Sequence, residues 1–95
     1  MELKAYIYHK DTGRLAISVP FFADSMNIGR FVATDYMIGE LINNPPKELT
    51  EAVDQLPGKW EDADEVYKLA SDMVDKYYFM EVEEPYWAQL ERTKE

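Results

Sequence analysis

The chain has 95 residues, of which 46% are hydrophobic and none is cysteine. This length suits a single domain with a modest core, and the apolar content argues against wholesale disorder. The lack of cysteine excludes disulfides, thiol catalysis and cysteine-bound zinc, and it fits a reducing compartment. The N-terminus does not resemble a signal peptide, and no apolar run reaches the roughly 20 residues of a membrane span. We therefore expect one cytoplasmic domain over residues 1–95, with no membrane partner.

Charge is the most informative property of the composition. Nineteen acidic residues face ten basic ones, for a net charge of −9, and residues 47–95 hold fourteen of the acids but only six of the bases. The negative electrostatic field of this acidic half repels phosphate backbones and attracts basic protein surfaces. We expect a protein partner with a basic surface and no direct binding of nucleic acid. The alternative is that the acidity serves solubility alone.

The first 20 residues predict a β-hairpin. Apolar and polar side chains alternate over residues 3–8 and again over residues 15–19, which is the period of a strand. Residues 9–13 read as the turn, in which Gly13 supplies a positive φ. Pro20 lacks a backbone N–H and is expected to end the second strand.

Residues 21–44 allow two interpretations. We favour a helix that is capped by Asp24 or Ser25 and runs to about residue 42. The alternative is a third strand over residues 30–38, which are rich in β-formers and bracketed by glycines. Asp35 interrupts the helical face, whose apolar members are Ile28, Phe31, Val32, Ile38, Leu41 and Ile42.

The second half predicts two helices and a strand. One helix begins at Pro46 and is stopped by Pro57 and Gly58, and the next begins near Glu61. A short strand over residues 78–82 follows and could join the hairpin, and residues 85–92 form at most a turn or two of helix. The apolar stripe of the longer helix is Val66, Leu69, Ala70, Met73, Val74 and Tyr77. We expect this stripe, up to Val74, to pack on Leu15, Ile17 and Val19 of the hairpin.

The predicted fold class is thus α+β. A small antiparallel sheet, made of the N-terminal hairpin and a C-terminal strand, packs with two to three helices.

Catalytic chemistry finds little support in the sequence. His9 is the single histidine and falls in the predicted turn, so we expect it to be dispensable polar surface. The acidic run over residues 61–65 lacks the glycine and ligand spacing of a calcium loop and suits the solvated first turn of a helix. No glycine-rich phosphate loop is present. We expect neither an enzyme nor a cofactor or metal site.

Binding of another protein is the better-supported function. Acidic residues at the start of the longer helix and along it would meet a basic partner, and two tryptophans beside chain breaks would anchor the contact. The expected partner-binding residues are Glu61, Asp62, Asp64, Glu65, Asp72, Asp75, Trp60 and Trp87.

Two classes of binding protein remain open, ahead of a small enzyme that uses carboxylates or tyrosines. The first is an acidic inhibitor that occupies the nucleic-acid-binding site of a nuclease or defence enzyme. Anti-CRISPR, antirestriction and immunity proteins of phages and mobile elements have this general profile, although composition is not a family match. The second is a structural or regulatory interaction module without mimicry, including a homodimer. An exposed apolar patch would favour this second class.

Overall fold

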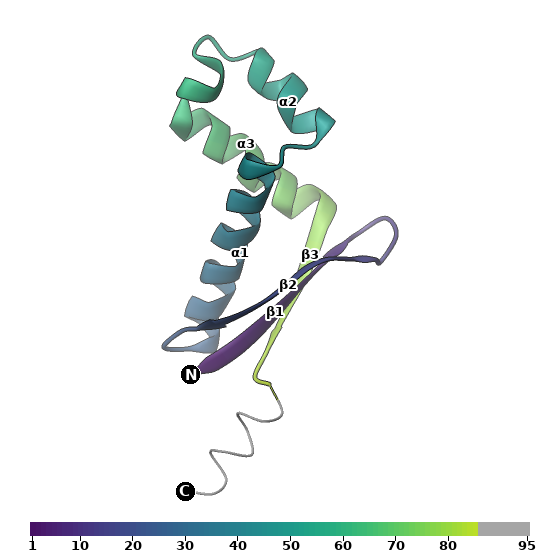
Figure 1. The fold of residues 1–95 in the computed structure, drawn as a ribbon, viewed down its shortest axis with the longest axis vertical. Coiled ribbons are helices and arrows are strands. Elements are labelled where there is room, and N and C mark those ends of the chain that lie inside the picture. The colour runs from purple at the N-terminus through teal and green to yellow at the C-terminus, as the bar shows by residue number, and fades with distance from the viewer. Residues whose placement is uncertain (86–95) are drawn as a thin grey trace, which may run out of the picture.

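The computed structural model describes residues 1–85 and shows a three-stranded antiparallel sheet with helices on one of its faces (Figure 1). The α+β class predicted from the sequence is confirmed. The elements in chain order are β1 (Glu2–His9), β2 (Leu15–Phe22), α1 (Met26–Asn43), α2 (Lys47–Asp54), the 3-10 helix η1 (Lys59–Glu61), α3 (Ala63–Tyr77) and β3 (Tyr78–Glu83).

The sheet has the strand order β2-β1-β3, so the first strand of the chain lies in its centre. The predicted hairpin forms, and Gly13 adopts a φ of 70° in its turn. The predicted C-terminal strand also forms and pairs with β1 from His9↔Tyr78 to Lys4↔Glu83. Both neighbours of the central strand are therefore edge strands.

Pro20 does not end the second strand, contrary to our expectation. β2 continues to Phe22, and Pro20 pairs with Lys4 of β1. Since β2 is an edge strand, one of its sides has no neighbour that would need the missing N–H. Proline is therefore tolerated within this strand.

Residues 26–43 form one helix of 18 residues, which excludes the alternative of a third strand at residues 30–38. Ser25 is the N-cap, and its hydroxyl accepts a hydrogen bond of 3.2 Å from the backbone N–H of Ile28. Gly29 brings the start of α1 close to the sheet, because a Cβ at this position would overlap Leu3 Cδ1. No helix within residues 1–85 is long and apolar enough to cross a bilayer.

The helices α2 and α3 form a lobe that stands beyond one end of the sheet (Figure 1). α3 packs on α1, α2 and β3, and it passes into β3 without a loop. As predicted, Pro46 marks the start of α2, where it is the N-cap residue, while α3 starts at Ala63 with Asp62 as its cap residue.

The core lies between the central strand and the three α-helices. β1 contributes Leu3, Ala5 and Ile7, each at most 1% exposed. The helical part of the core consists of buried side chains from α1, α2 and α3, namely Met37, Ile38, Leu41, Leu49, Val53, Val66, Ala70 and Val74.

The expected packing of the α3 stripe on the second strand is only partly correct. Val66, Ala70 and Val74 are buried, whereas Leu69 and Met73 are half-buried and Tyr77 is exposed. Ile17 reaches the core, but Leu15 is 50% exposed. The edge position of β2 leaves β1 and β3 nearest to the helices. In addition, the register shifts between Ile7 and Tyr8, so Leu15 pairs with Tyr8, on the face of the sheet away from the buried Ile7.

Candidate protein-binding surfaces

The acidic surface predicted from the sequence comprises Glu61, Asp62, Asp64, Glu65, Asp72 and Asp75. All six residues are exposed except Asp62, which is half-buried. At 100° per residue, Asp64, Asp72 and Asp75 fall on one side of α3, and the axial distance from residue 64 to residue 75 is about 16 Å. Lys68 falls on the same side and separates the acids into two groups. The structure thus places Asp64, Asp72 and Asp75 on one side of α3 with Lys68 among them, whereas Glu61 and Asp62 precede this helix.

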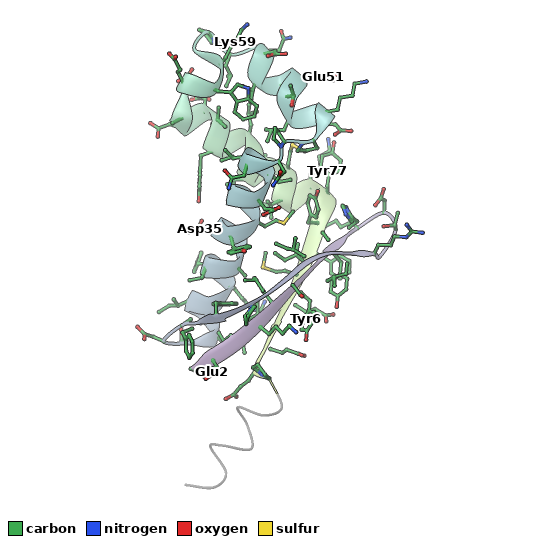
Figure 2. The ribbon with its side chains drawn as sticks, viewed as in Figure 1. Glu2, Tyr6, Asp35, Glu51, Lys59 and Tyr77 are labelled. Atoms are coloured by element: carbon green, nitrogen blue, oxygen red, sulfur yellow. The ribbon has the colours of Figure 1, made fainter. Side chains whose placement is uncertain are left out.

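Trp60 lies at the far end of the lobe, in η1, and is 40% exposed. It stands between Glu61, the first residue of the acidic surface, and Lys59, which adopts a left-handed φ of 49°. Figure 2 shows Lys59 at the end of the molecule opposite to Glu2. Trp87, the other tryptophan expected to bind a partner, lies outside the described residues, as does most of the segment 85–92.

An exposed apolar surface covers the side of α1 that faces away from the sheet, and the sequence interpretation missed it. Phe31 is 74% exposed, Tyr36 50% and Ile28 46%, and Tyr67 of α3 adds a further 47%-exposed ring. We name this set the outer patch, and its members are Ile28, Phe31, Val32, Tyr36 and Tyr67.

Asp35 lies within the outer patch, about midway along α1 (Figure 2). The Tyr67 hydroxyl donates a hydrogen bond of 2.5 Å to Asp35 Oδ1, which joins α3 to α1 at the surface. This hydrogen bond, with a smaller contribution from desolvation, raises the pKa of Tyr67 above its ordinary value. The outer patch therefore has an apolar surface with one fixed carboxylate inside it.

A signal for the outer patch was present in the sequence. Positions 28, 31, 32, 35 and 36 follow helical spacing, and so do positions 29, 33, 37 and 41 on the opposite side. The face expected from the sequence combines residues of both sides, which is why it is imperfect. The structure separates them, with Ile38 and Leu41 inside and Ile28, Phe31 and Val32 outside.

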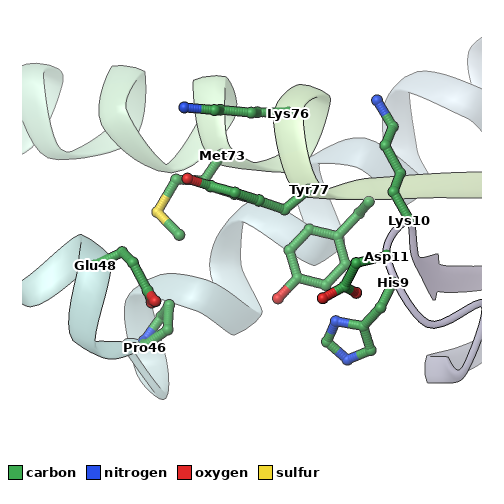
Figure 3. Close-up of a pocket in the computed structure, with 9 residues that line it drawn as sticks. His9, Lys10, Asp11, Pro46, Glu48, Met73, Lys76 and Tyr77 are labelled. Carbon is green, nitrogen blue, oxygen red and sulfur yellow. The ribbon is translucent and has the colours of Figure 1, made fainter.

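A depression of about 570 Å³ lies where the hairpin turn, the start of α2 and the end of α3 meet (Figure 3). We name it the tyrosine pocket. These segments are far apart in the sequence, so no local pattern predicts their meeting. The pocket is lined by His9, Lys10, Asp11, Pro46, Glu48, Met73, Lys76, Tyr77 and Tyr78.

His9 is not the exposed turn residue that the sequence suggested. It is the last residue of β1, is half-buried, and its ring lies 5.0 Å from that of Tyr78, measured between centroids. Burial raises the pKa of Tyr78, and the charges of Glu48 and Asp11 raise it further. Tyr78 lines the pocket with a neutral side chain, since even its ordinary pKa of 10.0 lies well above neutral pH.

The face of the sheet opposite the helices also carries aromatic side chains. Tyr8 of β1 and Phe79 of β3 stack with their ring centroids 5.0 Å apart, and Phe22 at the end of β2 is 74% exposed. Lys4 Nζ lies 5.2 Å from the centroid of the Tyr6 ring on the same strand. This face is more polar than the outer patch, because Lys4, Glu81 and Glu83 share it with the aromatic residues.

Within residues 1–85, no group of three or more histidine, aspartate or glutamate side chains is arranged to hold a metal ion. Comparison of the chain with protein-family models, with curated proteins and with solved structures gave no match.

Proposed function

We propose that this chain is a non-enzymatic protein that acts by binding another protein, with the outer patch as the apolar centre of the contact. The observation that carries the proposal is the double-sided apolar character of α1. One side of the helix is buried in the core, yet the other exposes Phe31, Tyr36 and Ile28 to solvent. A helix that is apolar on both sides is typical of one covered on both sides.

The chemistry of the partner follows from the charge around the outer patch. Asp35 lies inside the outer patch. Asp64 lies on α3 three residues before Tyr67, and therefore at the border of the outer patch. A second copy of this chain would bring another net charge of −9 against these carboxylates. We therefore favour a partner whose apolar contact is bordered by lysine and arginine, since complementary charge speeds association and selects the partner.

Inhibition of a nucleic-acid-binding enzyme is a second candidate function, and the acidic surface favours it. Five of its six carboxylates are exposed, before the start of α3 and along this helix, so they can meet the lysines and arginines that otherwise bind phosphate. The partner would then be a nuclease or defence enzyme in the cytoplasm, and the acidic surface would compete with its nucleic acid.

A retention experiment with matched phenylalanine variants tests the outer patch. The wild type, Phe31→Ser and Phe22→Ser are immobilised in turn and incubated with lysate of the producing cells, and retained proteins are quantified by mass spectrometry. Phe31 and Phe22 are equally exposed at 74% but lie on different surfaces. We expect the same specific protein with the wild type and Phe22→Ser, and its loss with Phe31→Ser. Retention that is unaffected by Phe31→Ser contradicts the proposal.

The acidic surface is tested on the partner so identified. Single rim charges contribute only about 0–1 kcal/mol each, so four acids are changed together to their amides: Glu61, Asp62, Asp64 and Glu65. The variant should associate more slowly, because complementary charge speeds association. Higher salt should weaken wild-type binding mainly through the association rate. If the partner binds this chain and its nucleic acid at the same time, inhibition by competition is wrong, while the outer patch remains the proposed contact.

A further inference from the structure

We propose that the tyrosine pocket is a binding site for an organic cation, a guanidinium or alkylammonium group carried on a short apolar chain. The pocket shares no residue with the outer patch, so this proposal does not depend on the proposed function. Four features of the pocket support it: its aromatic rings, its two carboxylates, the positions of its own lysines and its apolar side chains.

Aromatic rings form the wall of the pocket. Tyr77 and Tyr78 come from the junction between α3 and β3, and His9 comes from the end of β1, against Tyr78. Tyrosine faces attract cations within about 6 Å of the ring centroid. The ring of Tyr77 already shows this behaviour, because Lys76 Nζ lies 5.3 Å from its centroid.

Two carboxylates border the same space from opposite sides. Asp11 comes from the hairpin turn and Glu48 from the first turn of α2, and Figure 3 shows them on either side of the depression. Both residues line the same depression as Tyr77 and Tyr78. Neither carboxylate forms an ion pair with a lysine or arginine of residues 1–85. An anionic ligand would be repelled by both.

The two lysines of the pocket leave these carboxylates free. Lys10 Nζ donates a hydrogen bond of 2.5 Å to the backbone carbonyl of Asp75, near the end of α3. Lys76 lies over Tyr77 instead of bonding to Glu48. A ligand cation would therefore meet two unpaired carboxylates beside aromatic faces.

The apolar part of the wall suits the chain that carries the cation. Met73 of α3 and Pro46 before α2 border the depression, and the space of about 570 Å³ is larger than one cationic group needs. An alkyl stem would lie along these side chains while its charged end meets the carboxylates. The same chemistry is presented by a free small cation and by an arginine or lysine side chain.

Nuclear magnetic resonance titration of the full chain tests this site. The probes are n-butylguanidinium and n-butylammonium, with n-butyrate at equal ionic strength as the anionic control. We expect saturable shifts of the ring signals of His9, Tyr77 and Tyr78 with both cations and none with butyrate. Equal shifts with butyrate, or shifts that never saturate, would overturn the proposal.

Matched variants locate the cation. In the double variant Asp11→Asn, Glu48→Gln, both carboxylates are lost with little change of shape, and we expect affinity to fall about tenfold or more. Glu51→Gln is the control, since Glu51 lies on the same helix but pairs with Lys47 at 3.8 Å. Unchanged affinity in the double variant, with its thermal unfolding confirming an intact fold, would overturn the site.

A second arm distinguishes the two sources of the cation. The blocked tripeptides Ala-Arg-Ala and Ala-Lys-Ala are titrated alongside the free probes. Tighter binding of a tripeptide than of its free probe supports a side chain of a protein as the occupant, and the reverse order supports a small molecule. Failure of all four cations to bind would refute the proposal, without bearing on the outer patch.

Discussion

The two sides of α1 differ in burial along the helix and, over its first two turns, also in the size of their apolar residues. The side toward the sheet begins with two small residues, Gly29 and Ala33, both buried. The side toward solvent carries Phe31 and Tyr36, which are 74% and 50% exposed. Small residues let the helix approach the sheet, and large ones remain outside, where they add little to the stability of the free chain. The inner side thus serves the fold, and the outer side is available to a partner.

Truncation of the inner side should have the largest effect on stability. Ile38 is 2% exposed and belongs to the core that joins the helices. Ile38→Ala should lower the free energy of unfolding by about 2–5 kcal/mol, through lost burial and the cavity left behind. Urea unfolding followed by circular dichroism measures it. A loss comparable to that of a surface substitution would show that the core is not centred on this side of α1.

The two glycines of α1 should respond in opposite directions to the same substitution. Gly29→Ala should destabilise the chain by about 1–3 kcal/mol, because the added methyl overlaps Leu3. Gly39→Ala should stabilise it by roughly 0.5–1 kcal/mol, since nothing lies within 4 Å of an added Cβ and alanine favours the helix. Thermal unfolding of both variants under identical conditions gives the comparison. Equal signs would contradict the assignment of inner and outer sides.

Truncation on the outer side should hardly affect the fold. Phe31→Ser should change the free energy of unfolding by no more than about 0.5 kcal/mol, as expected for an exposed position. The same urea series as for Ile38→Ala provides the measurement. A loss similar to that of Ile38→Ala would mean that Phe31 is part of the core, and the outer patch would lose its basis.

The link between Asp35 and Tyr67 should make stability depend on pH in the alkaline range. The folded-state pKa of Tyr67 is raised above the ordinary value of 10.0, chiefly by its hydrogen bond to Asp35. This contribution is fully present below pH 10 and is lost as pH rises through the raised pKa. Tyr67→Phe removes the link, so its melting temperature should fall less steeply above pH 10 than that of the wild type. Parallel profiles would show that the link contributes no stability.

Local patterns predicted most of the elements, whereas the arrangement between elements could not be predicted. Ser25 as a cap, Gly13 in the turn and the stripe around Val66 depend on neighbours within a few residues, so the sequence shows them. The central position of β1 depends on pairing between residues 4–9 and 78–83, which no local pattern encodes. The register shift between Ile7 and Tyr8 is equally hidden in the sequence, and it pairs Leu15 with Tyr8, so Leu15 is exposed where we expected it to be buried.

The candidate sites divide along the same line. Exposure of Asp64 and Asp72 follows from helical periodicity and was predictable. The tyrosine pocket is formed by residues 9–11, 46–48 and 73–78, which are distant in the sequence, so it could not be predicted without the fold. The outer patch is only partly predictable. The helical spacing of its residues is visible in the sequence, but α1 has two apolar sides, and the sequence does not show which of them is buried.

Site-specific photo-crosslinking tests the outer patch most directly. A benzophenone side chain replaces Phe31 in one variant and Phe22 in the other, in the full chain within the cells that produce it. Both positions are 74% exposed, so their chance of random encounter is matched. We predict a discrete adduct with one basic protein from position 31 and none from position 22. Equal adducts from both positions, or an adduct at position 31 with the mass of two copies of this chain, would contradict the account.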